Sequence, residues 1–191
     1  NNISIDPGLN NPLSAHWYCV DYDDTVYVVA EHFESGKDVE YHSEAIKKKC
    51  DEIGWRRDND GRIRALIDSA ANQKTLSSLK SVTELFYDYG ILVNPKVNKD
   101  LFSGIARVKE YLKNDRLYIF KTCTNLIREL KRYRWGDGDV PKKVDDHSLD
   151  ELRYFIMSRP KPEKNDGNKS VIAIDKERLY RKIKRGRKNS R

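Results

Sequence analysis

Residues 14–33, SAHWYCVDYDDTVYVVAEHF, decide how the chain begins to fold. The two flanks of this stretch, residues 14–22 and 25–33, are rich in Val, Tyr and Trp, which favour β-strands. An Asp-Asp pair at residues 23–24 separates them, so the pattern predicts a β-hairpin. Another short apolar run at residues 3–6 precedes the hairpin, and we expect three antiparallel strands in succession.

The sequence that follows alternates between strand and helix patterns. Short apolar runs predict strands, and longer segments with apolar residues at helical spacing predict helices. Antiparallel strands followed by alternating strands and helices predict a mixed α/β sheet with helices on both faces. The predicted strands are residues 63–67, 91–93 and 117–120, and the predicted helices are residues 43–53, 75–89, 101–112, 124–133 and 148–158.

Composition narrows the class of protein. At 191 residues the chain is large enough for one domain with its own core. Its three cysteines stand far apart, so we expect reduced thiols and neither a disulfide framework nor a zinc site. No run of about 18 apolar residues is present, which excludes a transmembrane helix, and we expect no signal peptide. The chain begins with Asn and its sole methionine is Met157, so we expect it to be part of a longer protein.

Charge is distributed unevenly along the chain. Residues 159–191 hold 13 Lys and Arg against 4 Asp and Glu, a net charge of +9. Because the whole chain holds 37 basic and 30 acidic residues, residues 1–158 hold 24 and 26, a net charge of −2. We therefore expect a folded domain at residues 1–158 and a basic, loosely structured tail at residues 159–191. Nucleic-acid binding by the domain must depend on local patches and bound metal.

Two aspartates each follow a short apolar strand. Asp6 comes directly after residues 3–5, and Asp68 comes after residues 65–67. A carboxylate just past a strand end lies on the open rim of a sheet, where a substrate can reach it. Hydrolysis of phosphodiesters by two metal ions uses several such carboxylates from separate elements. A solvated turn aspartate is the alternative reading of either residue taken alone.

A third acidic set lies at residues 145–151, DDHSLDE, where the last predicted helix begins. If the first turn reaches back to His147, then His147 and Asp150 share a face and Asp146 lies nearly on it. This spacing brings carboxylates and an imidazole to the rim of the sheet, and hard cations such as Mg²⁺ take oxygen ligands. The alternative is a helix N-cap with acidic residues favoured by the helix dipole, which suits Asp146 or Ser148.

Basic residues near these positions have two readings, phosphate contact or a solvated surface. The candidates for contact with DNA are Lys96, Lys99, Arg107, Lys142 and Lys143. We assign surface or packing roles to the other histidines, His16, His32 and His42, and keep Glu31 as a reserve ligand.

Five segments stand in a fixed order along the chain: IDPG at residues 5–8, LIDSA at 66–70, GIARVK at 104–109, LIRELKRY at 126–133 and DDHSLDELRY at 145–154. Together they resemble the C-terminal nuclease domain of the large terminase subunit of tailed bacteriophages, over about residues 3–158. The Asp-His-x-x-Asp block followed by Arg-Tyr is the most specific part. The topology is also similar to the ribonuclease H fold.

The resemblance implies a ribonuclease H-like fold and an endonuclease that depends on Mg²⁺ or Mn²⁺. Such an enzyme cuts double-stranded viral DNA concatemers at the start and end of packaging, in the cytoplasm of the infected host. By the family motif, the implied catalytic residues are Asp6, Asp68, Asp150 and His147. The family varies in which residue of the last block binds metal, so the implied metal ligands are Asp6, Asp68, Asp150 and Asp146, with Asp145 left open.

The resemblance also implies partners. They are double-stranded DNA, the portal protein, the small terminase subunit and the family's N-terminal ATPase domain, with no membrane. This chain has no Gly-rich loop ending in Lys-Ser or Lys-Thr, so it lacks the ATPase motif. Two alternatives stay open: another ribonuclease H-like DNA nuclease of the resolvase or integrase type, and a non-catalytic module that docks to DNA or the portal through its basic tail.

Overall fold

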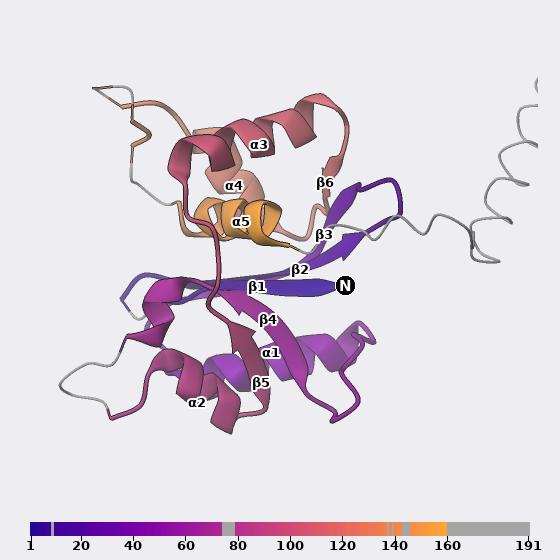
Figure 1. Ribbon diagram of the computed structural model, residues 1–191, viewed down its shortest axis with the longest axis vertical. Coiled ribbons are helices and arrows are strands. Elements are labelled where there is room, and N and C mark those ends of the chain that lie inside the picture. Colours follow the sequence, from indigo (N-terminus) through magenta and orange to yellow (C-terminus); the bar gives the residue numbers. More distant parts are fainter. Residues whose placement is uncertain (9, 74–78, 137, 139, 143–145, 160–191) are drawn as a thin grey trace, which may run out of the picture. The chain divides into compact units, whose positions relative to one another are not determined.

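In the described part of the chain, six strands form one mixed sheet (Figure 1). The computed structural model describes residues 1–159 except residues 9, 74–78, 137, 139 and 143–145. The strands are β1 (Asn2–Asp6), β2 (Leu13–Val20), β3 (Val26–Glu34), β4 (Ile63–Ile67), β5 (Ile91–Asn94) and β6 (Leu117–Ile119). Their order is β5-β4-β1-β2-β3-β6. β2 is antiparallel to β1 and β3, whereas β4 pairs in parallel with β1 and β5, and β6 pairs in parallel with β3.

The helices cover both faces of the sheet, as predicted for a mixed α/β fold. They are α1 (Val39–Glu52), α2 (Val82–Asp88), α3 (Leu101–Lys113), α4 (Thr124–Arg132) and α5 (His147–Ser158), with a short 3₁₀ helix at Ser69–Asn72. Helices α1 and α2 pack on one face, and α3, α4 and α5 lie on the other (Figure 1). Each face has its own buried apolar core. None of the helices described is long and apolar enough to span a bilayer.

Strand alternation separates apolar from polar side chains on β1. Ile3 and Ile5 are fully buried in the core formed with α1 and α2. Because successive side chains of a strand point to opposite faces, Ser4 and Asp6 lie on the face covered by α5. β2 repeats the pattern, with Leu13, Ala15 and Trp17 in the first core and Ser14, His16 and Tyr18 on the second face.

Two predicted helices differ from the structure at their starts. Ser81 and Glu84 form a capping box, so α2 begins at Val82. The prediction that this helix begins at residue 75 is therefore wrong for the described residues 79–81. Leu79, within the range predicted as helix, is 95% exposed. The helix predicted at residues 43–53 begins earlier, at Val39. Asp38 is its N-cap residue, and the Asp38 side chain accepts a hydrogen bond from the N–H of Tyr41 in the first turn. The predicted tail lies outside the described residues from residue 160 on.

Candidate functional site

A cavity of about 330 Å³ opens where β1 and β4 end and α5 begins. Four of its lining residues are aspartates from three different elements or their flanks. Basic and aromatic side chains complete the wall. The lining consists of Asp6, Asp68, Lys99, Leu101, Tyr133, Pro141, Asp146, Asp150, Arg153 and Tyr154.

Asp6 and Asp68 are neighbours because the strands that carry them are paired. Ile5 and Ile67 are partners in the parallel register of β1 and β4, so the two aspartates follow adjacent strands. The Asp68 N–H also donates to the Ile5 carbonyl at 3.2 Å. The sequence suggested exposed positions, but Asp6 is only 9% exposed and Asp68 only 7%. Both carboxylates therefore lie in the wall of the cavity, largely removed from water.

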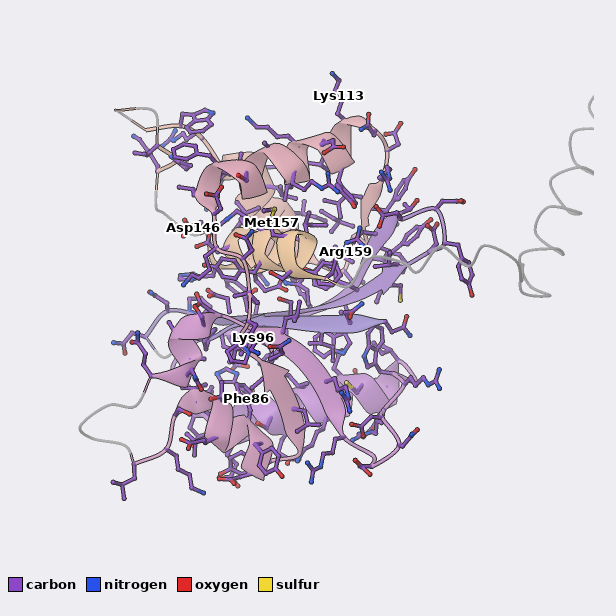
Figure 2. The ribbon with its side chains drawn as sticks, in the orientation of Figure 1. Phe86, Lys96, Lys113, Asp146, Met157 and Arg159 are labelled. Carbon is purple, nitrogen blue, oxygen red and sulfur yellow. The ribbon has the colours of Figure 1, made fainter. Side chains whose placement is uncertain are left out.

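The start of α5 brings the third acidic set to the same place. His147 is the first residue of the helix, and its Nδ1 lies 3.3 Å from Oδ2 of Asp6. Asp150 follows in the first turn, and its N–H donates to the Asp146 carbonyl at 2.8 Å. Figure 2 shows Asp146 at one end of α5 and Arg159 at the other end. Asp146 stands at the N-cap position but makes no side-chain cap hydrogen bond, so the N-cap alternative does not account for its carboxylate.

The carboxylates of Asp6 and Asp68 have different electrostatic surroundings. Burial raises the pKa of Asp6, and the charges of Asp150 and Asp68 add to the rise, while His147 opposes it. The hydrogen bond with Asp6 in turn raises the pKa of His147. Burial would also raise the pKa of Asp68, but the Ala70 amide and the Lys99 ammonium outweigh it and lower that pKa. The charged form is therefore disfavoured at Asp6, mainly by burial, and favoured at Asp68.

Two basic side chains form ion pairs with aspartates of the cavity. Nζ of Lys99 lies 2.7 Å from Oδ1 of Asp68, and Nη2 of Arg153 lies 2.7 Å from Oδ1 of Asp150. Nη1 of Arg153 donates to the Lys99 carbonyl at 2.9 Å, which ties the segment before α3 to α5. The Tyr154 hydroxyl lies 3.5 Å from Oδ2 of Asp150. The Lys99 ammonium lies over the Tyr154 ring, 5.6 Å from the ring centroid. Lys99, predicted as a DNA contact, is thus part of the cavity.

The donors of the cavity suit a hard divalent cation in kind. Asp6, Asp68, Asp146 and Asp150 offer carboxylate oxygens, which Mg²⁺ and Mn²⁺ accept. Among the residues described, however, no three His, Cys, Asp or Glu side chains are grouped so as to hold a metal ion. Lys99 and Arg153 form ion pairs with two of the four aspartates, Asp68 and Asp150.

The remaining residues predicted from sequence lie outside the cavity. Lys96 is exposed on the connection from β5 to α3 (Figure 2). Arg107 pairs with Glu110 on α3 at 3.1 Å. Lys142 is exposed next to the cavity residue Pro141, and its N–H donates to the Arg134 carbonyl at 3.1 Å. Lys143 and Asp145 fall outside the described residues.

Sequence reasoning missed a buried polar cluster between the sheet and α5. Nδ1 of His16 lies 2.6 Å from Oε2 of Glu151, and its Nε2 lies 3.4 Å from Oε2 of Glu31. Tyr18 donates to Glu151 at 2.7 Å. Burial alone would lower the pKa of His16, but Glu151 and Glu31 raise it to about 9. Glu31, the reserve ligand, belongs to this cluster and is not among the cavity residues. The polar side chains at alternate positions on β2 were the available signal.

Comparison with known proteins gives a consistent result. Residues 3–159 match the family model described as the terminase RNaseH-like domain. The nuclease domain of the P22 large terminase is similar in structure with a TM-score of 0.69 at 21% identity, over 83% of this chain and 80% of that chain. The nuclease domain of the SPP1 large terminase with bound Mn gives a TM-score of 0.53 at 17% identity, over 81% of this chain and 84% of that one.

A longer protein is also similar. The large terminase of the thermophilic bacteriophage D6E, in complex with ADP, gives a TM-score of 0.67 at 24% identity. The match covers 83% of this chain but only 39% of the D6E chain. No curated protein matches the sequence. These similarities confirm the predicted ribonuclease H-like fold.

Proposed function

Because the chain belongs to the terminase RNaseH-like domain family, we propose that it is a divalent-metal-dependent endonuclease that cuts double-stranded viral DNA concatemers during genome packaging. The match of residues 3–159 to that family confirms the predicted resemblance. The observation that carries the proposal is that Asp6, Asp68 and Asp150, from β1, the end of β4 and α5, line one cavity. Carboxylates from separate elements at the open end of a sheet are what phosphodiester hydrolysis by metal ions requires.

Asp6, Asp68, Asp146 and Asp150 are the proposed ligands of one or two Mg²⁺ or Mn²⁺ ions. When bound, such ions activate a water molecule and stabilise the charge of the leaving oxygen. The bound Mn of the SPP1 nuclease domain supports a divalent metal in this family. The rise in the pKa of Asp6, which burial causes in the main, fits the same role, because a bound cation would stabilise the charged form of this carboxylate.

His147 is the proposed catalytic partner of the aspartates. Its Nδ1 lies 3.3 Å from Oδ2 of Asp6, and this hydrogen bond raises the pKa of His147. The contact fixes the orientation of the ring at the edge of the cavity. From there, the imidazole can orient the attacking water or the leaving group.

The proposed DNA contacts are Lys96, Lys99, Arg107, Lys142 and Lys143. The first four are exposed or partly exposed, on segments around the cavity, where they can contact phosphates. Such contacts are independent of sequence, so we expect little sequence preference in cleavage. The partners proposed from the family are the portal protein, the small terminase subunit and an ATPase domain, in the cytoplasm of the infected host.

Plasmid cleavage by the purified chain tests the proposal. Supercoiled DNA should be nicked and linearised with Mg²⁺ or Mn²⁺ and remain intact with EDTA. Asp68→Asn should lose the activity, while Asp60→Asn, an exposed turn residue before β4, should keep it. Full activity in Asp68→Asn would refute the assignment.

The two alternative functions predict other results. A resolvase-type enzyme would cut branched DNA far faster than linear duplex. A docking module would bind DNA without metal and lose binding when residues 159–191 are removed.

A further inference from the structure

Glu129 is a fully buried carboxylate that the proposed chemistry does not use. It lies on α4, and its Oε2 accepts hydrogen bonds from the N–H groups of Ser148 at 2.8 Å and Leu149 at 3.2 Å. These amides belong to the first turn of α5. Burial raises the pKa of Glu129 to about 7, against the effect of the two amides. A carboxylate held in such a place indicates a specific contact, because burial of a charge is costly without partners.

The contact supplies what the start of α5 lacks. The first N–H groups of a helix have no partner within the helix, and a side chain at the N-cap usually accepts from one of them. Asp146 stands at that position without making this bond. Glu129 takes its place from another helix, and a negative charge there is also favoured by the helix dipole. The start of α5 is therefore fixed by α4.

Two further buried glutamates extend this arrangement into the sheet. Glu31 on β3 accepts from the N–H groups of Asn125 at 2.9 Å and Leu126 at 3.2 Å, and so caps α4. Glu151 on α5 binds His16 on β2, whose other ring nitrogen faces Glu31. The contacts thus run from β3 to α4, from α4 to α5, and from α5 back to the sheet. Each step uses a carboxylate that is largely or fully buried.

We propose that Glu129 is a positioning residue of the nuclease centre, which sets the first turn of α5 so that His147 and Asp150 face Asp6. The inference rests on the proposed function, since it concerns the same site. The contact at Ser148 lies between the two functional positions, one residue after His147 and two before Asp150. A shift of this turn would move both side chains relative to Asp6, which is held independently on β1.

The experiment compares Glu129→Ala, Glu129→Gln and a control, Glu44→Gln, with the unaltered chain. Glu44 is an exposed glutamate on α1, on the other face of the sheet, so its substitution removes the same charge away from the site. Three quantities are measured: hydrogen exchange of the amides at residues 147–150, the dissociation constant for Mn²⁺ by calorimetry without DNA, and plasmid cleavage. Circular dichroism checks that each variant is folded.

We expect faster exchange of these amides in Glu129→Ala and a dissociation constant for Mn²⁺ raised by about ten- to a hundredfold, as for other residues that orient metal ligands. Glu129→Gln keeps an acceptor oxygen and should recover part of both properties. If Glu129→Ala does not fold, Glu129→Gln alone tests the inference, and its dissociation constant for Mn²⁺ should rise by a smaller factor. Glu44→Gln should match the unaltered chain.

The outcomes separate the inference from the proposed function. If the unaltered chain binds Mn²⁺ and cleaves DNA, and the Glu129 variants exchange faster but bind Mn²⁺ equally well, Glu129 is structural only and the inference is overturned. If the unaltered chain neither binds Mn²⁺ nor cleaves DNA, the proposed function fails, and the inference fails with it. A loss of Mn²⁺ affinity confined to the Glu129 variants supports the inference.

Discussion

The ammonium group of Lys99 lies 2.7 Å from a carboxylate oxygen of Asp68, inside the cavity that the aspartates line. A lysine in this place can act as a DNA contact or as a cation that competes with metal for Asp68. The two roles predict different effects of Lys99→Met on metal binding in the absence of DNA.

If Lys99 competes, Lys99→Met should bind Mn²⁺ more tightly than the unaltered chain. The side chain of Lys99 is 42% exposed, and such ion pairs are worth about 1 kcal/mol or less, so we expect a gain of about two- to fivefold. Calorimetry with Mn²⁺ measures this, and Lys96→Met removes the same charge from the same connection as a control. Unchanged Mn²⁺ affinity together with weaker DNA binding would leave Lys99 as a phosphate contact only.

Gly104→Ala tests the close packing of α3 against α5. A Cβ at residue 104 would overlap Cγ and Cδ of Arg153, the side chain that binds Asp150. In an exposed helix the change would stabilise by about 1 kcal/mol, but overpacking costs about 1–3 kcal/mol, so we expect a net loss of stability. Denaturation by guanidinium measures it, and cleavage should fall as Arg153 moves.

A double-mutant cycle checks the cause of that loss. If the overlap with Arg153 destabilises Gly104→Ala, the same substitution in an Arg153→Ala background should be neutral or stabilising, because the clashing atoms are gone. An equal loss in both backgrounds would show that the tight approach is not what residue 104 provides.

The overall fold could be predicted because the strands carry their own signals. The Val, Tyr and Trp of β2 and β3 and the apolar runs before Asp6 and Asp68 are local features, and the structure has strands at each of them. The cavity could be anticipated only in part. Parallel pairing of β1 with β4 joins Asp6 to Asp68, but no local pattern states which strands pair.

The buried glutamates could not be predicted from local patterns. Glu129 lies in a helix with basic neighbours and reads as a surface residue, yet it is fully buried because α5 packs over it. His16 reads as a packing residue, and its partner Glu151 is 135 residues away in the sequence. Long-range pairing of charges depends on the packing of α4 and α5, which the sequence of either helix does not contain.

The pair of histidines on α1 and β3 makes a prediction about pH. Nε2 of His32 lies 2.9 Å from Nδ1 of His42, and burial together with the charge of His42 lowers the pKa of His32 to about 4. The unfolded chain binds a proton near pH 6.5, so between about 6.5 and 4 it holds more protons than the folded chain. This pair should therefore reduce stability as the pH falls through that range.

His32→Gln removes the titrating ring and should weaken this dependence. The free energy of unfolding of the variant and of the unaltered chain is compared at pH 7.5 and pH 5, so that shared carboxylate titrations cancel. We expect the unaltered chain to lose more stability between the two values. A parallel loss in both proteins would mean that the pair does not respond to acid.

Asp6 and Asp68 should differ in what they do to stability, although both are proposed to be essential for cleavage. Because the pKa of Asp6 is raised, the charged form is disfavoured in the folded state at pH 7, and Asp6→Asn should raise the unfolding temperature in EDTA. The pKa of Asp68 is lowered, so its charge stabilises the fold, and Asp68→Asn should lower that temperature. We expect changes of about 1 kcal/mol or less in either direction.

Thermal melts with EDTA and with Mn²⁺ test the contrast, with Asp60→Asn as the neutral control. A ligand that binds only the folded state raises the unfolding temperature of the unaltered chain, and both site variants should lose most of that gain. Equal destabilisation of the two variants in EDTA would contradict the idea that burial disfavours the charge of Asp6 in the folded state. If only Asp6→Asn raises the unfolding temperature in EDTA, the charge of Asp6 is the one that the fold tolerates least when no cation is bound. A carboxylate that destabilises the fold in this way is expected in a metal site, where function is kept at the expense of stability.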